Sequence, residues 1–444
     1  MKYLTRLNCG ASLMKLNRIF RYIEKKNRSM FFKDVARLVS GSFAAKLVLL
    51  GTTPFATRMY SPEDYGLLSV YIGIVGVLAT IATLRLDFAI PLAQTDADAD
   101  LLLILSLITL SIFVVVSGYL FAVSSHVLFS LLGQPELKNY QLMIPIGIFL
   151  AGLFSTLQML ATRKRKFRLI GTSRVIQALL SSAIILGLGY VGIKPTGLFL
   201  GNMLAFGVGS IFLILIALVA LNNVRRMENL SLRLKNCFLK YRKYPKFSAP
   251  EALLNIAGLQ IPIITIAAID QFISGQLFLA VTLGLLPMAL LGSSIGQVYS
   301  SRVVKSISDG ELLQLTNSTL ISTGRIAIPL ILIGGCMSPL AVPILFGDEW
   351  YLVGTYLLYM MPWLILQVLA SPVSMIFHAL GKQKHALVLQ IFGFIVRVVS
   401  VLVASLISPN SAVLVFLLGS AIFYLIYLVT IIKTVRNYSL TFES

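Results

Sequence analysis

Apolar residues follow one another along this chain in long stretches that short polar segments separate. A helix that crosses the hydrocarbon core of a bilayer needs about 20 predominantly apolar residues, and stretches of this kind recur almost from end to end. Twelve spans are predicted, near residues 36–57, 66–90, 101–122, 140–160, 169–191, 196–221, 247–269, 276–298, 319–346, 352–378, 386–407 and 411–432. The pattern therefore predicts an all-α polytopic membrane protein.

The composition agrees with this interpretation. Of the 444 residues, 57% are hydrophobic and only 12% are charged, whereas roughly 25% of the residues in an average soluble domain are charged. This excludes a soluble globular enzyme. Cys9, Cys237 and Cys336 are scattered along the chain, so we expect no disulfide framework and no redox chemistry.

Basic residues outnumber acidic residues by 37 to 17, but they lie mainly in short loops, so we expect no nucleic-acid partner. If the N-terminus is cytoplasmic, 30 of the 37 fall in cytoplasmic segments, and the outside loops hold only Arg58, Lys138 and Lys194. The positive-inside rule then places both termini in the cytoplasm. Contact with anionic membrane lipids explains the basic loops at 163–168 and 222–246.

Residues 1–30 form a basic N-terminal extension without the apolar core of a signal peptide. Apolar residues recur at helical spacing among its lysines and arginines, which is typical of a helix lying on the inner leaflet. The alternative is that translation starts at Met30.

The chain contains a weak internal repeat. Sliding residues 42–90 by 209 places Ser42 on Glu251, Lys46 on Asn255 and Gly66 on Gly275. Six spans are an even number, so the second copy keeps its orientation, and a pseudo-twofold axis along the membrane normal would relate two six-helix bundles around a central cavity. The predicted units are an N-terminal bundle at 31–221, a cytoplasmic linker at 222–246, a C-terminal bundle at 247–433 and a cytoplasmic tail at 434–444.

Charged residues within the spans are candidate functional residues, because each costs roughly 2.5–3.5 kcal/mol even on lenient insertion scales. Lys46 lies deep in the first span, and Ser42 falls on the same helix face. On the matching helix, Glu251 and Asn255 form a second polar stripe. We expect the two stripes to face one aqueous cavity.

Further cations lie in other spans. Arg397 is in the middle of its span, whereas Arg174 and Arg325 lie nearer to span ends, and Arg85 and Asp87 close the second span. Snorkelling of Arg174 and Arg325 to the interface, or pairing of Arg85 with Asp87, is the alternative to a functional role. Because cations exceed acids within the spans, we expect a cavity that accepts an anion, and guanidinium groups suit phosphate oxygens.

Searches for enzyme motifs give no candidate. Gly187, Gly189 and Gly192 match GxGxxG, but they end an apolar span with no strand before them. The sequence holds no P-loop, and its three histidines lack the spacing of a zinc site. We therefore expect neither a cofactor nor a metal, and no catalytic residues.

Several motifs in order along residues 31–435 resemble Wzx-type polysaccharide flippases. They are the run Phe31 to Val35 leading to Lys46, the turn Tyr60 to Gly66, the segment Leu84 to Ile90, Arg165 to Phe167, Tyr244 to Pro250, Leu286-Pro287 with Gly292 to Val298, and Leu380 to Lys384. The resemblance implies the multidrug, oligosaccharidyl-lipid and polysaccharide exporter superfamily, and with it two six-helix bundles that form a V-shaped central cavity.

The resemblance also implies a function. Members of this family move undecaprenyl-pyrophosphate-linked oligosaccharide units from the cytoplasmic to the periplasmic leaflet of the bacterial inner membrane. They serve O-antigen, lipopolysaccharide or capsule assembly, where a polymerase and chain-length proteins would be partners. The resemblance carries no residue-level site, and depth and periodicity alone give a predicted substrate site of Ser42, Lys46, Arg174, Asn255, Arg325 and Arg397. Glu251 and Asp87 are the candidates for coupling to a proton or sodium ion.

Three alternatives stay open at this stage. A cation-coupled drug exporter of the same superfamily would need acidic cavity residues, but here the bases within spans outnumber the acids. A membrane-embedded glycan ligase or polymerase usually carries a large periplasmic loop, and the longest outside loop here is short, at about residues 123–139. A purely structural membrane protein is hard to reconcile with charges deep in the spans.

Overall fold

The computed structural model describes residues 40–225 and 227–443, and helices account for nearly all of them. A first helix occupies residues 40–59. It is followed by α2 (Pro62–Ala82), η1 (Asp87–Leu92), α3 (Asp96–Leu131), η2 (Pro135–Tyr140), α4 (Met143–Arg163), α5 (Phe167–Tyr190), α6 (Thr196–Gly207), α7 (Ser210–Arg225) and α8 (Leu230–Tyr241). The second half contains η3 (Tyr244–Ser248), α9 (Ala249–Ala267), α10 (Gln271–Ser308), α11 (Leu312–Phe346), η4 (Asp348–Trp350), α12 (Tyr351–Val373), α13 (Ile376–Ala379), α14 (Gln383–Ser405) and α15 (Pro409–Glu443).

Ten helices within the described residues are long and apolar enough to cross a membrane. Each of the twelve predicted spans overlaps a helix, including the helix at 40–59 and α10. The described residues contain no strand. The predicted all-α polytopic fold is therefore confirmed, whereas the predicted extension at 1–30 lies outside the described residues.

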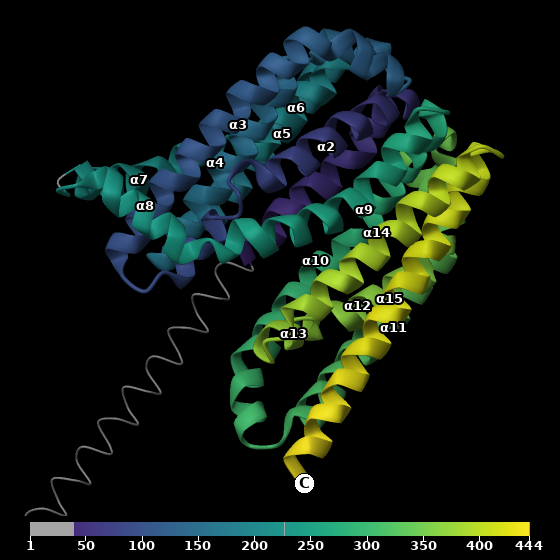
Figure 1. The fold of residues 1–444 in the computed structure, drawn as a ribbon. Helices are drawn as coiled ribbons and strands as arrows, with labels where there is room; N and C mark the ends of the chain where they lie inside the picture. The colour runs from purple at the N-terminus through teal and green to yellow at the C-terminus, as the bar shows by residue number, and fades with distance from the viewer. Residues whose placement is uncertain (1–39, 226, 444) are drawn as a thin grey trace, which may run out of the picture.

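The helices form two groups that meet at one end and diverge toward the other (Figure 1). Helices α2 to α8 make up the first group, which we call the N-bundle together with the helix at 40–59, and α9 to α15 make up the second, the C-bundle. Within the C-bundle, α12 packs on α10, α11 and α15. The two bundles touch mainly where α2 packs on α9 and α10.

Several predicted boundaries were wrong. The second span does not reach residue 90, because α2 ends at Ala82 and a turn precedes η1. The predicted linker 222–246 is not a loop throughout, since it contains α8. α10 continues to Ser308 and α15 to Glu443, so part of a predicted loop is helical, and the predicted tail is helical as far as Glu443. Polar residues in these places extend helices beyond the apolar stretches from which the spans were predicted.

The helix α8 is fixed to the N-bundle through the start of α3. Lys240 forms an ion pair with Asp98 at 2.6 Å, and the hydroxyl of Tyr241 donates to the same carboxylate at 3.2 Å. The hydrogen bond to Asp98 raises the pKa of Lys240, and burial raises the pKa of the Cys237 thiol to about 11. The predicted linker therefore belongs structurally to the N-bundle up to Tyr241.

Candidate functional site

Two cations from different helices meet inside the N-bundle. Lys46, on the helix at 40–59, is half-buried and lies within electrostatic range of Arg174 on α5. The Arg174 guanidinium donates to the hydroxyl of Ser42 and, at 2.9 Å, to the side-chain oxygen of Gln158 on α4. Within the described residues, neither cation forms an ion pair with a carboxylate. We call Ser42, Lys46, Gln158 and Arg174 the cationic cluster.

A second polar group surrounds the turn that ends α2. Leu84 and Arg85 both adopt left-handed backbone conformations, with φ of 51° and 59°, which side chains other than glycine rarely adopt. The turn directs the Arg85 guanidinium against the ring of Phe88, 3.5 Å from its centroid. Such stacking holds the planar group in one orientation. Arg85 Nε is buried without a hydrogen-bond partner among the described residues.

Asp87 lies beside Arg85 but does not pair with it. Its two carboxylate oxygens accept hydrogen bonds from the hydroxyls of Thr83 at 2.8 Å and Ser155 at 2.6 Å. Within the described part of the chain, no hydrogen bond or ion pair joins Arg85 to Asp87, although the carboxylate lies within electrostatic range of the guanidinium. Asp87 is 2% exposed, and the two hydroxyls satisfy the buried carboxylate instead.

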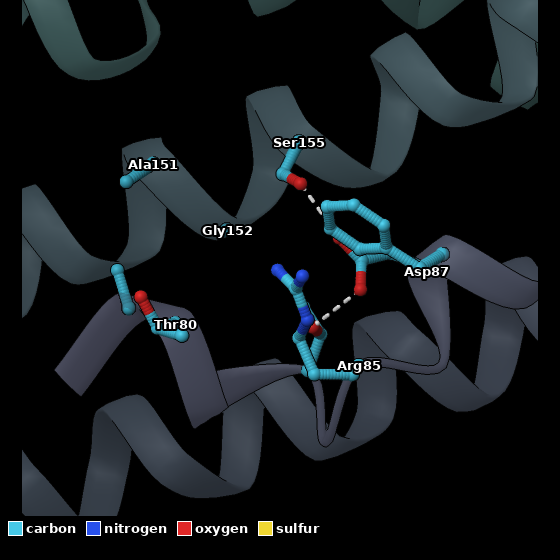
Figure 2. Close-up of a pocket in the computed structure, with 9 residues that line it drawn as sticks. Thr80, Arg85, Asp87, Ala151, Gly152 and Ser155 are labelled. Atoms are coloured by element: carbon cyan, nitrogen blue, oxygen red, sulfur yellow. Dashed lines mark hydrogen bonds between the residues drawn. The ribbon is translucent and has the colours of Figure 1, made fainter. Parts of the chain in front are cut away.

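These residues line a pocket of about 200 Å³ between the end of α2 and α4 (Figure 2). Figure 2 shows the Arg85 guanidinium pointing toward Gly152, away from the Asp87 carboxylate. The lining residues are Ala79, Thr80, Thr83, Arg85, Asp87, Phe88, Ala151, Gly152 and Ser155. We call this cavity the Arg85 pocket.

Helix α4 connects the pocket to the cationic cluster. Ser155 bonds Asp87 and Gln158 bonds Arg174, and residues three apart on a helix are neighbours on its surface. The N-bundle thus presents a polar strip that carries Arg85, Arg174 and Lys46. The arrangement is suited to holding an anion with several oxygen atoms, since guanidinium groups bind phosphate oxygens in pairs.

The C-bundle contributes Glu251, which lies within electrostatic range of Arg85 and of Tyr427 on α15. Asn255, one turn further along α9, is exposed. Glu251 of the second predicted stripe therefore lies near Arg85, which belongs to neither predicted stripe. Lys46 instead meets Arg174 of its own bundle.

Arg397 does not join this strip. It is 2% exposed and sits between α14, α9 and α15 of the C-bundle. Its Nε donates to the carbonyl of Gly393 at 2.9 Å, and its guanidinium carbon lies 4.5 Å from the centre of the Phe423 ring. Its Nη2 lies beside Gly258, where a Cβ atom would approach it to 2.8 Å. The prediction that Arg397 lines the cavity disagrees with this placement, because neighbouring helices cover the side chain.

Arg325 also lies apart from the strip. It is exposed on α11, away from the face on which Thr323, Gly324 and Ala327 are buried. This placement fits the snorkelling alternative, in which a long cationic side chain reaches the membrane interface. Of the predicted cations, Lys46 and Arg174 are therefore the two that the structure brings together. No group of three or more His, Cys, Asp or Glu within the described residues could hold a metal ion.

Comparison with protein families gives a match to the family described as polysaccharide biosynthesis protein, over residues 55–353. The chain belongs to this family. The resemblance drawn from the sequence motifs is thereby confirmed at the level of the family. The search of curated proteins found no match.

Several solved transporter structures share the fold of this chain. The lipid II flippase MurJ in an inward closed conformation matches with a TM-score of 0.68 at 16% identity, covering 91% of this chain and 90% of that chain. A point mutant of the MATE transporter VcmN from Vibrio cholerae matches with a TM-score of 0.64 at 14% identity, covering 91% and 96%. At these identities the likeness establishes the fold alone.

A third structure with this fold is a MOP superfamily transporter from Pyrococcus furiosus. It has a TM-score of 0.58 at 15% identity and covers 91% of this chain and 96% of that chain. The reverse polarity of its binding pocket is described as suggesting a different function for that transporter. Pocket polarity therefore varies among proteins of this fold, so the charge of the polar strip has to be read from this chain's own residues.

Ser155 and Gln158 were not among the residues predicted from the sequence. Both are uncharged, and a serine or glutamine within an apolar helix carries no strong signal by itself. A signal was present for Arg85, since it stands two residues before Asp87 at the end of a span. An ion pair between Arg85 and Asp87 at the membrane interface explains the same spacing, so the spacing alone does not assign Arg85 to the substrate site.

Proposed function

We propose that this protein is a flippase for undecaprenyl-pyrophosphate-linked oligosaccharides. In this role it would move repeat units from the cytoplasmic to the periplasmic leaflet of a bacterial inner membrane, for O-antigen or capsular polysaccharide assembly. The observation that carries the proposal is the polar strip, in which no carboxylate of the described residues is bound to Lys46, Arg174 or Arg85. The family match to polysaccharide biosynthesis and the transporter fold support it.

The electrostatics favour a phosphate-bearing substrate over a cationic drug. One cation and one phosphate charge at 4 Å attract by about 4 kcal/mol at an effective dielectric constant of 20. Two or three such contacts would offset much of the cost of desolvating a pyrophosphate. A cationic drug would instead be repelled by Lys46 and Arg174, while Asp87 is already occupied by two hydroxyl donors.

Glu251 is the proposed coupling group, because it lies near Arg85 from the opposite bundle. A phosphate that binds Arg85 would compete with Glu251 for the guanidinium. Uptake of a proton or sodium ion by Glu251 would neutralise its charge and so weaken this competition. Asp87 remains the second coupling candidate. A polymerase and chain-length proteins of the same pathway are the proposed partners, and no cofactor or catalytic step enters the mechanism.

The test is movement of undecaprenyl-pyrophosphate-linked glycan across proteoliposome membranes, measured by its accessibility to an added glycan-cleaving enzyme. The native protein is compared with Lys46→Ala and with Lys138→Ala, which removes a cation from the predicted outside loop. We expect movement by the native protein and by Lys138→Ala, and loss of movement in Lys46→Ala. Movement by all three would contradict the site, and no movement by folded native protein would favour drug export.

A further inference from the structure

The sixth predicted span is interrupted near its middle. The stretch Thr196–Arg225 has 30 residues and is long and apolar enough to cross a membrane, but α6 ends at Gly207 and α7 begins at Ser210. In a continuous helix the N–H of Gly209 would donate to the carbonyl of Ala205. Groups that a break frees within a bilayer need another partner, because the hydrocarbon core offers no water to bond them.

One side chain bonds both of these groups. Gln177, on α5, donates from Nε2 to the carbonyl of Ala205, and its Oε1 accepts the N–H of Gly209 at 3.2 Å. The side-chain amide of Gln177 thus takes the place of the backbone hydrogen bond that the break removes. Insertion of a side chain into the hydrogen-bond ladder is a known cause of kinks in helices. We call these two hydrogen bonds the Gln177 bridge.

Glycines make room for the bridge. A Cβ atom on Gly209 would lie 2.6 Å from Gln177 Oε1 and 3.0 Å from the ring of Phe154 on α4. A Cβ atom on Gly207 would overlap the carbonyl oxygen of Leu150, also on α4. Both positions therefore require a residue without a Cβ atom. The break is packed closely against α4 and α5.

The bridge lies next to the cationic cluster on both of these helices. On α5, Arg174 precedes Gln177 by three residues. On α4, Gln158 follows Phe154 by four residues and accepts a hydrogen bond from Arg174 at 2.9 Å. Residues three or four apart are neighbours on the surface of a helix. The side chains at the break and those of the cluster therefore share one face of α4 and one face of α5.

Ser181 extends the row of polar residues on α5, four residues after Gln177. Its hydroxyl donates to the carbonyl of Gly201 on α6 at 2.8 Å. Two members of the row, Gln177 and Ser181, are thus bonded to the sixth span, whereas Arg174 belongs to the cationic cluster. Two hydrogen bonds from one planar group fix geometry more strictly than a single bond. The Gln177 bridge therefore restricts the rotation of α5 one turn away from Arg174.

We propose that Gln177 is a positioning residue of the substrate site: the Gln177 bridge holds α5 in the rotation at which the Arg174 guanidinium meets Ser42 and Gln158. The inference rests on the proposed function, in which Arg174 binds the pyrophosphate, and Gln177 acts through Arg174 rather than by contact with the substrate. Loss of the bridge would free α5 to turn. It would also leave two backbone groups of the sixth span without a partner in an apolar environment, which is costly.

The first test measures the affinity of the full-length protein in detergent for inorganic pyrophosphate, by isothermal titration calorimetry. Gln177→Met removes the bridge at nearly constant side-chain volume. Ser181→Ala is the matched control, because it removes a hydrogen bond from α5 to the same span but leaves the bridge in place.

We expect Gln177→Met to weaken pyrophosphate binding by about fivefold, as for the loss of ordinary hydrogen bonds, and Ser181→Ala to stay within about twofold of native. Equal affinities of Gln177→Met and the native protein would overturn the positioning role. Equal losses in both variants would also overturn it, because any hydrogen bond between α5 and the sixth span would then serve as well as the bridge.

A second pair of variants disturbs the bridge from the other side. Gly209→Ala places a Cβ atom against Gln177 Oε1, whereas Gly187→Ala on α5 is the control, because no atom lies within 4 Å of a Cβ there. We expect Gly209→Ala to weaken pyrophosphate binding and Gly187→Ala to leave it unchanged. Gly209→Ala combined with Gln177→Met should bind no more weakly than the weaker single variant, because both changes act through one bridge. Losses that add in the double variant would contradict the proposal.

A third measurement needs no substrate. Spin labels at Arg168→Cys near the start of α5 and Asn222→Cys near the end of α7, both exposed positions, report the distance between these helices once the three native cysteines have been replaced. We expect Gln177→Met to shift or broaden the distance distribution and Ser181→Ala to leave it unchanged.

An unchanged distribution in folded Gln177→Met would overturn the proposal, whatever the pyrophosphate affinities are. If Gln177→Met shifts the distribution but the native protein binds no pyrophosphate, the bridge stands and the proposed substrate site fails. The two proposals can therefore fail separately.

Discussion

Lys46 and Arg397 look alike in the sequence, as single cations near the middle of apolar spans, yet they have opposite surroundings. Lys46 is half-buried beside Arg174, on a strip that continues to an open pocket. Arg397 is 2% exposed and is covered by α9 and α15. The depth of a charged residue in a span therefore indicates that the residue is functional or structural rather than incidental. The residues on the neighbouring helices decide whether the charge is accessible to a substrate or is packed inside a bundle.

The difference depends on a glycine. Gly258 leaves room for the Arg397 guanidinium against the backbone of α9, and Phe423 covers it from α15. Near Lys46 the groups are polar instead, since Arg174, within electrostatic range of Lys46, donates to Ser42 and Gln158. A buried cation that packs on an aromatic ring gains attraction from the ring face, but it offers no surface to a substrate.

Lys46→Met should have the largest effect, because it removes a charge from the strip while keeping most of the side-chain volume. We expect glycan movement to fall by roughly tenfold to a hundredfold, which corresponds to the loss of about 1.4–2.8 kcal/mol of attraction. The thermal unfolding midpoint in detergent should not change. A lower unfolding midpoint together with unchanged glycan movement would show that Lys46, like Arg397, has a structural role and not a binding role.

Gly258→Ala should have the next largest effect, and on stability. The added methyl group would meet the Arg397 Nη2 atom at 2.8 Å, and overpacking of a core costs about 1–3 kcal/mol. We expect a lower unfolding midpoint in detergent. Gly419→Ala on α15 is the control, because its Cβ would find ordinary contacts at 3.5 Å or more. Equal midpoints for the two variants would show that Arg397 is less constrained than its contacts indicate.

Arg174→Gln should have a smaller effect than Lys46→Met. Glutamine removes the charge but keeps a donor for Ser42 and Gln158, and it relieves the repulsion from Lys46. We expect glycan movement to fall by about threefold to tenfold, since one of several cations is lost at a partly solvated site. Movement is measured in the same proteoliposomes, and a loss larger than that of Lys46→Met would place the main phosphate contact on Arg174.

Arg397→Met should have the smallest effect on transport. Replacing a buried charge by an apolar side chain of similar volume is often neutral or stabilising, so we expect movement within about twofold of native and an equal or higher unfolding midpoint. A tenfold loss of movement at a native midpoint would instead make Arg397 a substrate-binding residue in another state of the cycle.

The fold could be predicted from the sequence because each membrane helix must satisfy its own backbone, which leaves a long apolar stretch as the signature. That Lys46 and Ser42 share a helix face followed from helical spacing, but the hydrogen bond from Arg174 to Ser42 depends on the packing of the helix at 40–59 against α5. The turn at Leu84 and Arg85 could not be predicted, because neither residue favours a left-handed backbone. The covering of Arg397 depends on Gly258, a long-range contact that no local pattern specifies.

The lengths of α10 and α11 have a mechanical consequence. They contain 38 and 35 residues, and at 1.5 Å per residue each is more than 50 Å long, well beyond the roughly 30 Å hydrocarbon core. α10 starts at its contact with α2, where Gly275 packs against Pro62. If that contact stays in place, a tilt of about 10° there displaces the far end of a helix of this length by about 10 Å. A small change of angle where the two bundles touch would thereby become a large displacement at the other end of α10.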